Sequence, residues 1–97
     1  MAELLSDSEV DQALAKLPEW RRDGDSIGRK AQLASFVQAI EVVDRVADLA
    51  EAADHHPDID IRWRTLLFRL STHSAGGLTE KDFQLAGQIE ELLATAG

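Results

Sequence analysis

All three histidines of this 97-residue chain lie in its second half, as the adjacent pair His55-His56 and as His73. Histidine is the side chain best able to give and take a proton near neutral pH. Glu51 and Asp54 come shortly before the pair, and a carboxylate beside an imidazole favours the charged ring and can fix its tautomer. Because the chain has no cysteine, this set indicates acid–base chemistry without a thiol nucleophile.

The predicted secondary structure brings these histidines together. The adjacent pair lies at a helix-to-strand junction, and residues 58–72 predict an antiparallel hairpin whose two ends meet, which places His73 close to the pair. Asp82, after a glycine loop, can fold back to the same place. Junctions of this kind often carry function because rigid elements hold a free loop. The structural alternative is that His55 only caps a helix end and His56-Pro57 only forms a turn.

A metal site is a second interpretation of the same residues. Three histidines with a nearby acid can hold zinc and leave one position open. Adjacent histidines on an extended segment project to opposite sides, however, and Pro57 pushes His56 toward that extended conformation. We therefore expect no metal.

Length and composition predict one globular domain spanning residues 1–97. The hydrophobic fraction of 44% is enough for a core, although a chain this short leaves much surface exposed and gains from self-association. A net charge of −8 without a basic stripe argues against nucleic acid as a partner. The sequence shows no signal peptide and no run of the roughly 20 apolar residues that a membrane helix needs. We expect a cytoplasmic protein that crosses no membrane.

The first half of the chain predicts a helix and a hairpin. Ser6 and Glu9 have the spacing of a capping box, and the apolar positions that follow repeat at helical spacing until Pro18. Residues 20–22 and 27–33 then flank an Asp-Gly-Asp turn signal, which predicts two strands. The expected order up to residue 33 is therefore helix, strand, strand.

A long helix follows and leads to the histidine pair. Ser35 caps this helix, and apolar residues at helical spacing carry it to about Ala53. Asp54 would fall near the middle of the apolar face if the helix continued. Either the helix ends there, or a carboxylate turns inward.

A second hairpin and a last helix complete the chain. Residues 58–63 and 66–70 alternate between apolar and polar side chains, which predicts half-buried strands. Thr79 caps the last helix, with Asp82 at its third position, where an acid suits the positive helix end. The order α-β-β-α-β-β-α predicts an α+β fold, a four-stranded antiparallel sheet with helices packed on one face.

The tryptophans and the strand arginines have mainly structural explanations. Trp63 continues the inward alternation of its strand, which predicts a core position. Trp20 lies where a strand begins, and is either core or a flat wall for a planar ligand. Arg62, Arg64 and Arg69 are expected on a solvated strand face.

The motif Glu51-x3-His55-His56-Pro57-x5-Trp63-x9-His73-x8-Asp82 resembles the signature of the pterin-4a-carbinolamine dehydratases. The segments Ser71-Thr72-His73 and Gly77-Leu78-Thr79 also fit. The resemblance covers nearly the whole chain from Leu17 onward, and it is specific because many residue types recur at set spacings.

This resemblance implies an antiparallel four-stranded sheet with helices on one face and assembly as homodimers or homotetramers. It implies dehydration of 4a-hydroxytetrahydropterin to the quinonoid dihydropterin, which regenerates the cofactor of aromatic amino acid hydroxylases without a metal or cofactor. The catalytic residues implied are His55, His56 and His73. The supporting and substrate-binding residues implied are Glu51, Asp54, Pro57, Asp82 and Trp20.

Two other functions stay open. Some relatives on this fold are non-catalytic assembly or dimerisation partners, although intact histidines argue against that role here. A small-molecule or metal sensor is disfavoured because the chain lacks thiols and DNA-binding features. Which histidine is the acid and which the base is not determined by the sequence.

Overall fold

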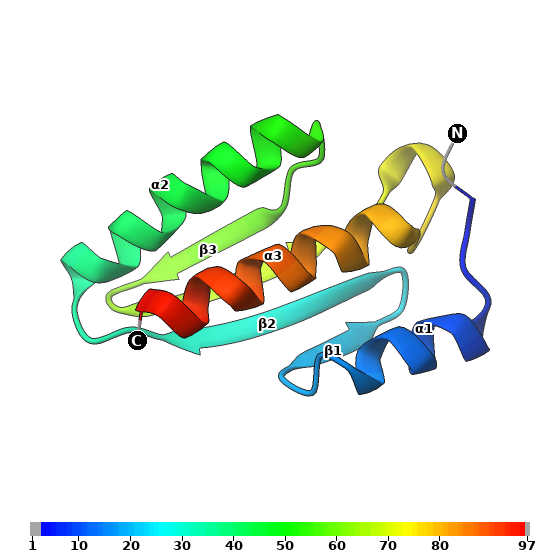
Figure 1. Cartoon of the computed structure of the whole chain (residues 1–97), viewed down its shortest axis with the longest axis horizontal. Helices are drawn as coiled ribbons and strands as arrows, with labels where there is room; N and C mark the ends of the chain where they lie inside the picture. The colour runs from blue at the N-terminus through cyan, green and yellow to red at the C-terminus, as the bar shows by residue number, and fades with distance from the viewer. Residues whose placement is uncertain (1–2, 97) are drawn as a thin grey trace.

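The computed structural model of the chain describes residues 3–96 (Figure 1). Its four strands form one antiparallel sheet in the order β1-β2-β4-β3. The predicted order α-β-β-α-β-β-α is confirmed, with a short 3-10 helix, η1, added before the last helix. The elements are α1 (Asp7–Ala15), β1 (Trp20–Asp23), β2 (Ser26–Gln32), α2 (Phe36–Ala53), β3 (Asp58–Arg62), β4 (Thr65–Leu70), η1 (His73–Ala75) and α3 (Glu80–Ala96).

The predicted helix caps are present. The backbone N–H of Glu9 donates to Ser6 Oγ at 3.1 Å, and that of Ser6 donates to Glu9 Oε1 at 2.9 Å, which completes the capping box of α1. Ser35 caps α2 by accepting from the Gln38 N–H at 3.1 Å. These bonds satisfy N–H groups that a helix leaves unpaired at its start. No helix in the described part of the chain is long and apolar enough to cross a membrane.

The helices cover one face of the sheet and leave the other open (Figure 1). On the covered face alternate residues of β2 and β4 are fully buried, among them Ile27, Leu66 and Phe68. On the open face Lys30 and Leu67 are exposed. The helical part of the core consists of Val10 in α1, Ala39, Val42 and Val46 in α2, and Leu85, Ala86 and Ile89 in α3.

The β3–β4 hairpin has its open end at the histidines. Its register runs from Asp58 opposite Arg69 to Arg62 opposite Thr65. The start of β3 and the end of β4 therefore lie side by side. The histidine pair precedes β3 and His73 follows β4, so the chain returns to the same end of the sheet, as the sequence predicts.

The prediction that Trp63 lies in the core is wrong. Its side chain is 70% exposed and its φ of 54° is left-handed. Because Arg62 pairs with Thr65, strand alternation stops before Trp63, which occupies the turn. Arg64 is also a turn residue, and not part of a solvated strand face: it is half-buried, with its guanidinium carbon 4.8 Å from the Trp63 ring centroid. Arg62 and Arg69 are exposed on their strands as expected.

Candidate active site

A left-handed residue at the end of α2 positions His55. Asp54 has φ 49° and ψ 43°. Its N–H bonds to the Glu51 carbonyl at 3.2 Å, and the His55 N–H bonds to the Ala50 carbonyl at 3.1 Å. These are the two bonds of the Schellman motif, which ends a helix and turns the chain. The helix therefore ends at Asp54, whose side chain is exposed and not turned inward, and the turned backbone carries His55 toward the protein interior.

His55 and Asp82 form a buried pair. Their Nε2 and Oδ1 atoms lie 2.6 Å apart, and their side chains are 10% and 0% exposed. Asp82 is the third residue of α3, where its Oδ2 accepts the backbone N–H of Thr79 at 2.9 Å. The same carboxylate thus caps a helix and holds an imidazole. The prediction that Asp82 folds back toward the histidines is met by this contact.

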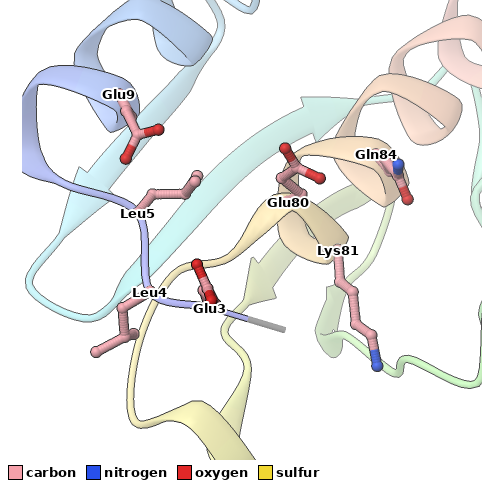
Figure 2. A pocket seen from close by; sticks show the side chains of 7 residues that line it. All are labelled: Glu3, Leu4, Leu5, Glu9, Glu80, Lys81 and Gln84. Carbon is pink, nitrogen blue, oxygen red and sulfur yellow. The ribbon is translucent and has the colours of Figure 1, made fainter. Parts of the chain in front are cut away.

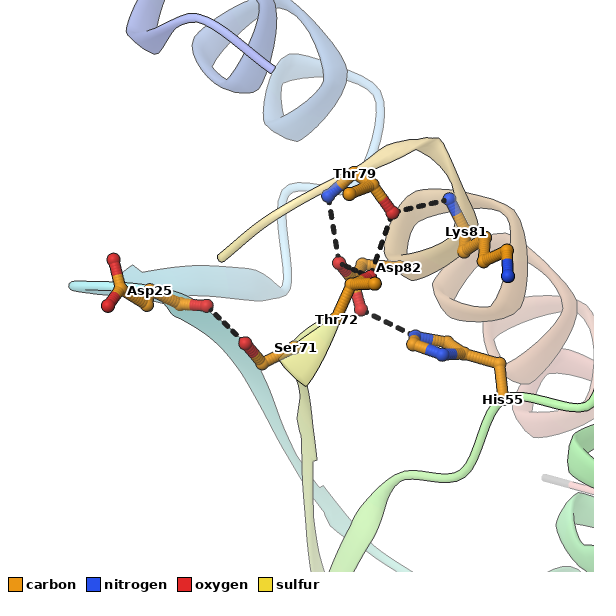
Figure 3. Close-up of polar contacts among 7 residues, drawn as sticks. All are labelled: Asp25, His55, Ser71, Thr72, Thr79, Lys81 and Asp82. Carbon is orange, nitrogen blue, oxygen red and sulfur yellow. Dashed lines mark hydrogen bonds and ion pairs between the residues drawn. The ribbon is translucent and has the colours of Figure 1, made fainter. Parts of the chain in front are cut away.

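Thr72 reaches the same carboxylate from the segment after β4. Its hydroxyl donates to Asp82 Oδ2 at 2.8 Å (Figure 3). Asp82 Oδ2 therefore accepts hydrogen bonds from the Thr72 hydroxyl and the Thr79 backbone N–H, and Oδ1 lies against His55 Nε2. A carboxylate that already accepts two hydrogen bonds is suited to the ionised form, which only accepts. The Nε2 atom of His55 then carries a proton in this network, and Nδ1 is the ring nitrogen left for a substrate.

His56 and Glu51 form a second, exposed pair. Their Nε2 and Oε2 atoms lie 2.5 Å apart, and the side chains are 57% and 77% exposed. Exposed ion pairs contribute little to folding stability. The main consequence of this contact is therefore the orientation of the His56 ring at the surface.

His73 begins η1 directly after Thr72, and its side chain is exposed. The loop around it is closed by backbone bonds: the Thr72 N–H donates to the Gly77 carbonyl at 2.9 Å, and the Gly76 N–H donates to the His73 carbonyl at 3.1 Å. Gly76 has φ 78°, a conformation that favours glycine. One peptide unit thus separates His73 from the threonine that contacts Asp82.

Pro57 and Trp20 occupy different surroundings. Pro57 is half-buried between the histidine pair and β3. Trp20 is 3% exposed, and its Nε1 donates to Glu90 Oε1 at 2.8 Å. Glu90 lies two turns beyond Asp82 on α3, roughly 12 Å along the helix axis. Of the two roles considered for Trp20, burial and position favour the core.

A cavity of about 330 Å³ lies beside His55, between the end of α2 and the first half of α3. Polar side chains on α3, namely Lys81, Gln84 and Gln88, line it together with apolar residues. A hollow of about 560 Å³ near the N-terminal segment shares Lys81 and Gln84 but contains no histidine (Figure 2). Small-molecule sites begin at about 300 Å³, so the cavity beside His55 is large enough and is the better placed of the two.

Sequence reasoning missed Thr72 and Lys81 as site residues. A hydroxyl immediately before a candidate histidine, at the end of a strand, was the available signal for Thr72. Lys81 is the second residue of α3. A cation in the first turn is unfavourable with the helix dipole, which was the available signal that Lys81 has a role other than stabilising the helix. Within residues 3–96 no group of three or more histidine, aspartate or glutamate side chains is arranged to hold a metal ion.

Comparison with known proteins gives one consistent family. A family model described as Pterin 4 alpha carbinolamine dehydratase matches residues 3–92. A protein of Nocardia farcinica, assigned by name to the pterin-4-alpha-carbinolamine dehydratases, is 63% identical over 90 residues, which cover 93% of this chain and 95% of its own. One from Roseiflexus castenholzii with the same assignment is 57% identical over 93 residues, covering 96% of this chain and 100% of its own.

Solved structures share the fold. A transcriptional coactivator/pterin dehydratase from Brucella melitensis gives a TM-score of 0.89 at 30% sequence identity, covering 92% of this chain and 97% of that one. A pterin dehydratase-like protein identified as a RuBisCO assembly factor in the α-carboxysome gives 0.66 at 22% identity, covering 77% and 89%. The second likeness concerns the fold alone.

Proposed function

This chain belongs to the pterin-4α-carbinolamine dehydratase family, and on that premise we propose that it is a hydro-lyase that converts 4a-hydroxytetrahydropterin to quinonoid dihydropterin and water. The observation that carries the proposal is the buried contact of 2.6 Å between His55 and Asp82 beside a cavity. The other two histidines lie on the segments next to the same end of the sheet. Of the three, His55 lines the cavity where a small ligand fits.

Dehydration of the carbinolamine requires two proton transfers. The C4a–O bond breaks as its oxygen takes a proton and leaves as water, and N5 loses its proton as the C4a–N5 double bond forms. Two positioned imidazoles supply an acid and a base. We assign the base to His55, which acts through its unprotonated Nδ1, and the acid to His73. His56, oriented by Glu51, contributes to binding, and Pro57 directs its segment.

The physiological context belongs to the same proposal. The product would re-enter the tetrahydropterin cycle that serves aromatic amino acid hydroxylases, in the cytoplasm. A net charge of −8 is compatible with a small-molecule substrate and disfavours nucleic acid as a partner. Each step needs only a proton transfer that side chains of this chain supply, so no metal or cofactor enters the scheme.

A stopped-flow assay tests this function directly. Protein mixed with chemically generated 4a-hydroxytetrahydropterin is expected to accelerate formation of the quinonoid product over the rate in buffer. Protein dialysed against a strong chelator is expected to keep the same rate and thermal midpoint. Activity lost on chelation and restored by stoichiometric zinc would instead support the metal-site interpretation. No acceleration at all would favour a non-catalytic assembly partner.

Exposed apolar side chains support self-association as part of the proposal. Phe36 and Val37 at the start of α2 are 50% and 66% exposed, and Leu67 on the open sheet face is 42% exposed. The outer strands β1 and β3 also present unpaired edges that a second copy can extend. We expect a homodimer or homotetramer, because a chain this small gains buried surface by association. Light scattering at micromolar concentration checks this, and a mass equal to one chain would contradict it.

A further inference from the structure

Two threonines and one carboxylate form a directional hydrogen-bond chain that ends at His55. Thr72, Thr79 and Asp82 are 3%, 0% and 0% exposed. The two hydroxyl oxygens lie 2.8 Å apart, and Asp82 Oδ2 lies 2.8 Å from the Thr72 hydroxyl (Figure 3). The opposite carboxylate oxygen faces His55 Nε2. All four groups are therefore joined away from solvent.

The direction of each bond follows from the number of protons available. A hydroxyl has one proton to donate, and Thr72 gives its proton to Asp82. The proton between the two hydroxyls must then come from Thr79, whose oxygen in turn accepts the Lys81 N–H at 3.2 Å. The bonds from Lys81 through Thr79 and Thr72 thus all point toward the carboxylate, whose other oxygen faces His55. The Thr72 hydroxyl and the Thr79 N–H together fix the orientation of the Asp82 carboxylate by their hydrogen bonds to Oδ2.

Capping of α3 does not require Thr72. The Thr79 oxygen and the Asp82 carboxylate already accept N–H groups of the first turn. Thr72 comes from a different element, and its backbone holds the η1 turn: its carbonyl accepts the N–H groups of Ala75 and Gly76, both at 3.0 Å. The residue is therefore joined to His55 through its side chain and to His73 through its backbone.

We propose that Thr72 is a positioning residue of the dehydratase reaction, which fixes the Asp82 carboxylate for His55 through its hydroxyl and holds the adjacent His73 through its backbone. The proposal rests on the function proposed above for the reaction itself. The contact between Thr72 and Asp82 is independent of that function, and so is the hydrogen bond that Asp82 makes to His55.

Three variants test the role of the hydroxyl. Thr72→Val keeps the branched shape but removes the bond to Asp82, and Thr72→Ser keeps the bond but removes a methyl group. Ser71→Ala is the matched control, because the neighbouring Ser71 hydroxyl donates to the Asp25 carbonyl at 2.6 Å and has no part in the chain of bonds (Figure 3). Circular dichroism confirms that each variant is folded.

The kinetic arm measures kcat and KM on the carbinolamine. Thr72→Val is expected to lower kcat about 10-fold, the usual effect of removing a partner that orients a functional group, while KM changes little. Thr72→Ser and Ser71→Ala are expected to stay near the wild-type kcat. A folded serine variant with kcat lowered about 10-fold would overturn the proposal, since packing of the methyl group would then explain the loss. That result does not depend on whether the valine variant folds.

The second arm needs no catalysis. The exchange of the His55 Nε2 proton with water, followed by ¹⁵N-edited NMR, reports how well the contact with Asp82 protects that proton, without any turnover. Thr72→Val is expected to accelerate that exchange about 10-fold, the size expected for loss of one hydrogen bond to a charged group, and Thr72→Ser is expected to leave it unchanged. Unchanged exchange in Thr72→Val overturns the positioning role. An inactive wild-type protein with accelerated exchange in the valine variant would refute the dehydratase function and leave the role of Thr72 on Asp82 intact.

Discussion

Replacing His55 by alanine is expected to lower the dehydration rate by roughly 10² or more, the range for a lost acid or base. Nε2 of His55 is committed to Asp82, and the ring lines the cavity. Alanine therefore removes the proton-exchanging atom Nδ1 from the place where we expect the substrate. Stopped-flow rates on the carbinolamine measure the effect. Because the change also leaves Oδ1 of the buried Asp82 without its His55 partner, the assay is run well below the thermal midpoint of the variant.

His73→Ala is expected to lower the rate by a similar roughly 10² or more, with little loss of stability because the side chain is exposed. His56→Ala is expected to act mainly on KM. Trp63→Ala serves as the control, since Trp63 is exposed in the turn at the far end of the β3–β4 hairpin. A folded His55→Ala/His73→Ala double variant with wild-type activity would show that the acid–base assignment is wrong.

The placement of all three histidines toward one end of the sheet was predictable because it depends on chain topology alone. An antiparallel hairpin returns its last residues to the level of its first, and the observed register places Arg69, three residues before Thr72, opposite Asp58. The starts of the helices were predictable from local sequence, since Ser6, Ser35 and Thr79 each cap the turn that follows them. Both kinds of inference use interactions between residues close in sequence or across one turn.

Side-chain directions at the turns were harder to predict. Alternation placed Trp63 inward, but the rule applies only while the residue belongs to a strand, and the sequence does not mark the last paired residue. Trp20 is fixed by Glu90, which lies far along the chain. The bond from Thr72 to Asp82 likewise joins two elements whose relative placement depends on the packed core. Contacts of this kind follow from tertiary structure, so residue spacing alone did not reveal them.

Replacing Asp82 by asparagine is expected to lower the dehydration rate by roughly 10² or more while leaving the fold in place. The position of Oδ2 receives two hydrogen bonds, from the Thr72 hydroxyl and the Thr79 N–H. In the asparagine side chain only the amide oxygen accepts hydrogen bonds. The amide oxygen therefore takes the position of Oδ2, and the amide nitrogen faces His55. Nε2 of His55 must then accept a hydrogen bond, its proton moves to Nδ1, and the ring presents a donor to the cavity in place of a base. The ¹⁵N shifts of the His55 ring report this tautomer, and stopped flow reports the rate.

The stability of two Asp82 variants separates this effect from simple loss of structure. Asp82→Asn is expected to change the free energy of unfolding by about 1 kcal/mol or less, because every donor around it still finds an acceptor. Asp82→Ala leaves the donors of His55, Thr72 and Thr79 unpaired at a site with 0% exposure, and is expected to cost about 3 kcal/mol or more. Asp48→Asn, on the exposed side of α2, is the control for loss of one negative charge and is expected to change neither quantity. If Asp82→Asn changed the His55 tautomer but kept the wild-type rate, His55 would not be the group that exchanges a proton with the substrate, and the catalytic assignment would have to move to the exposed histidines.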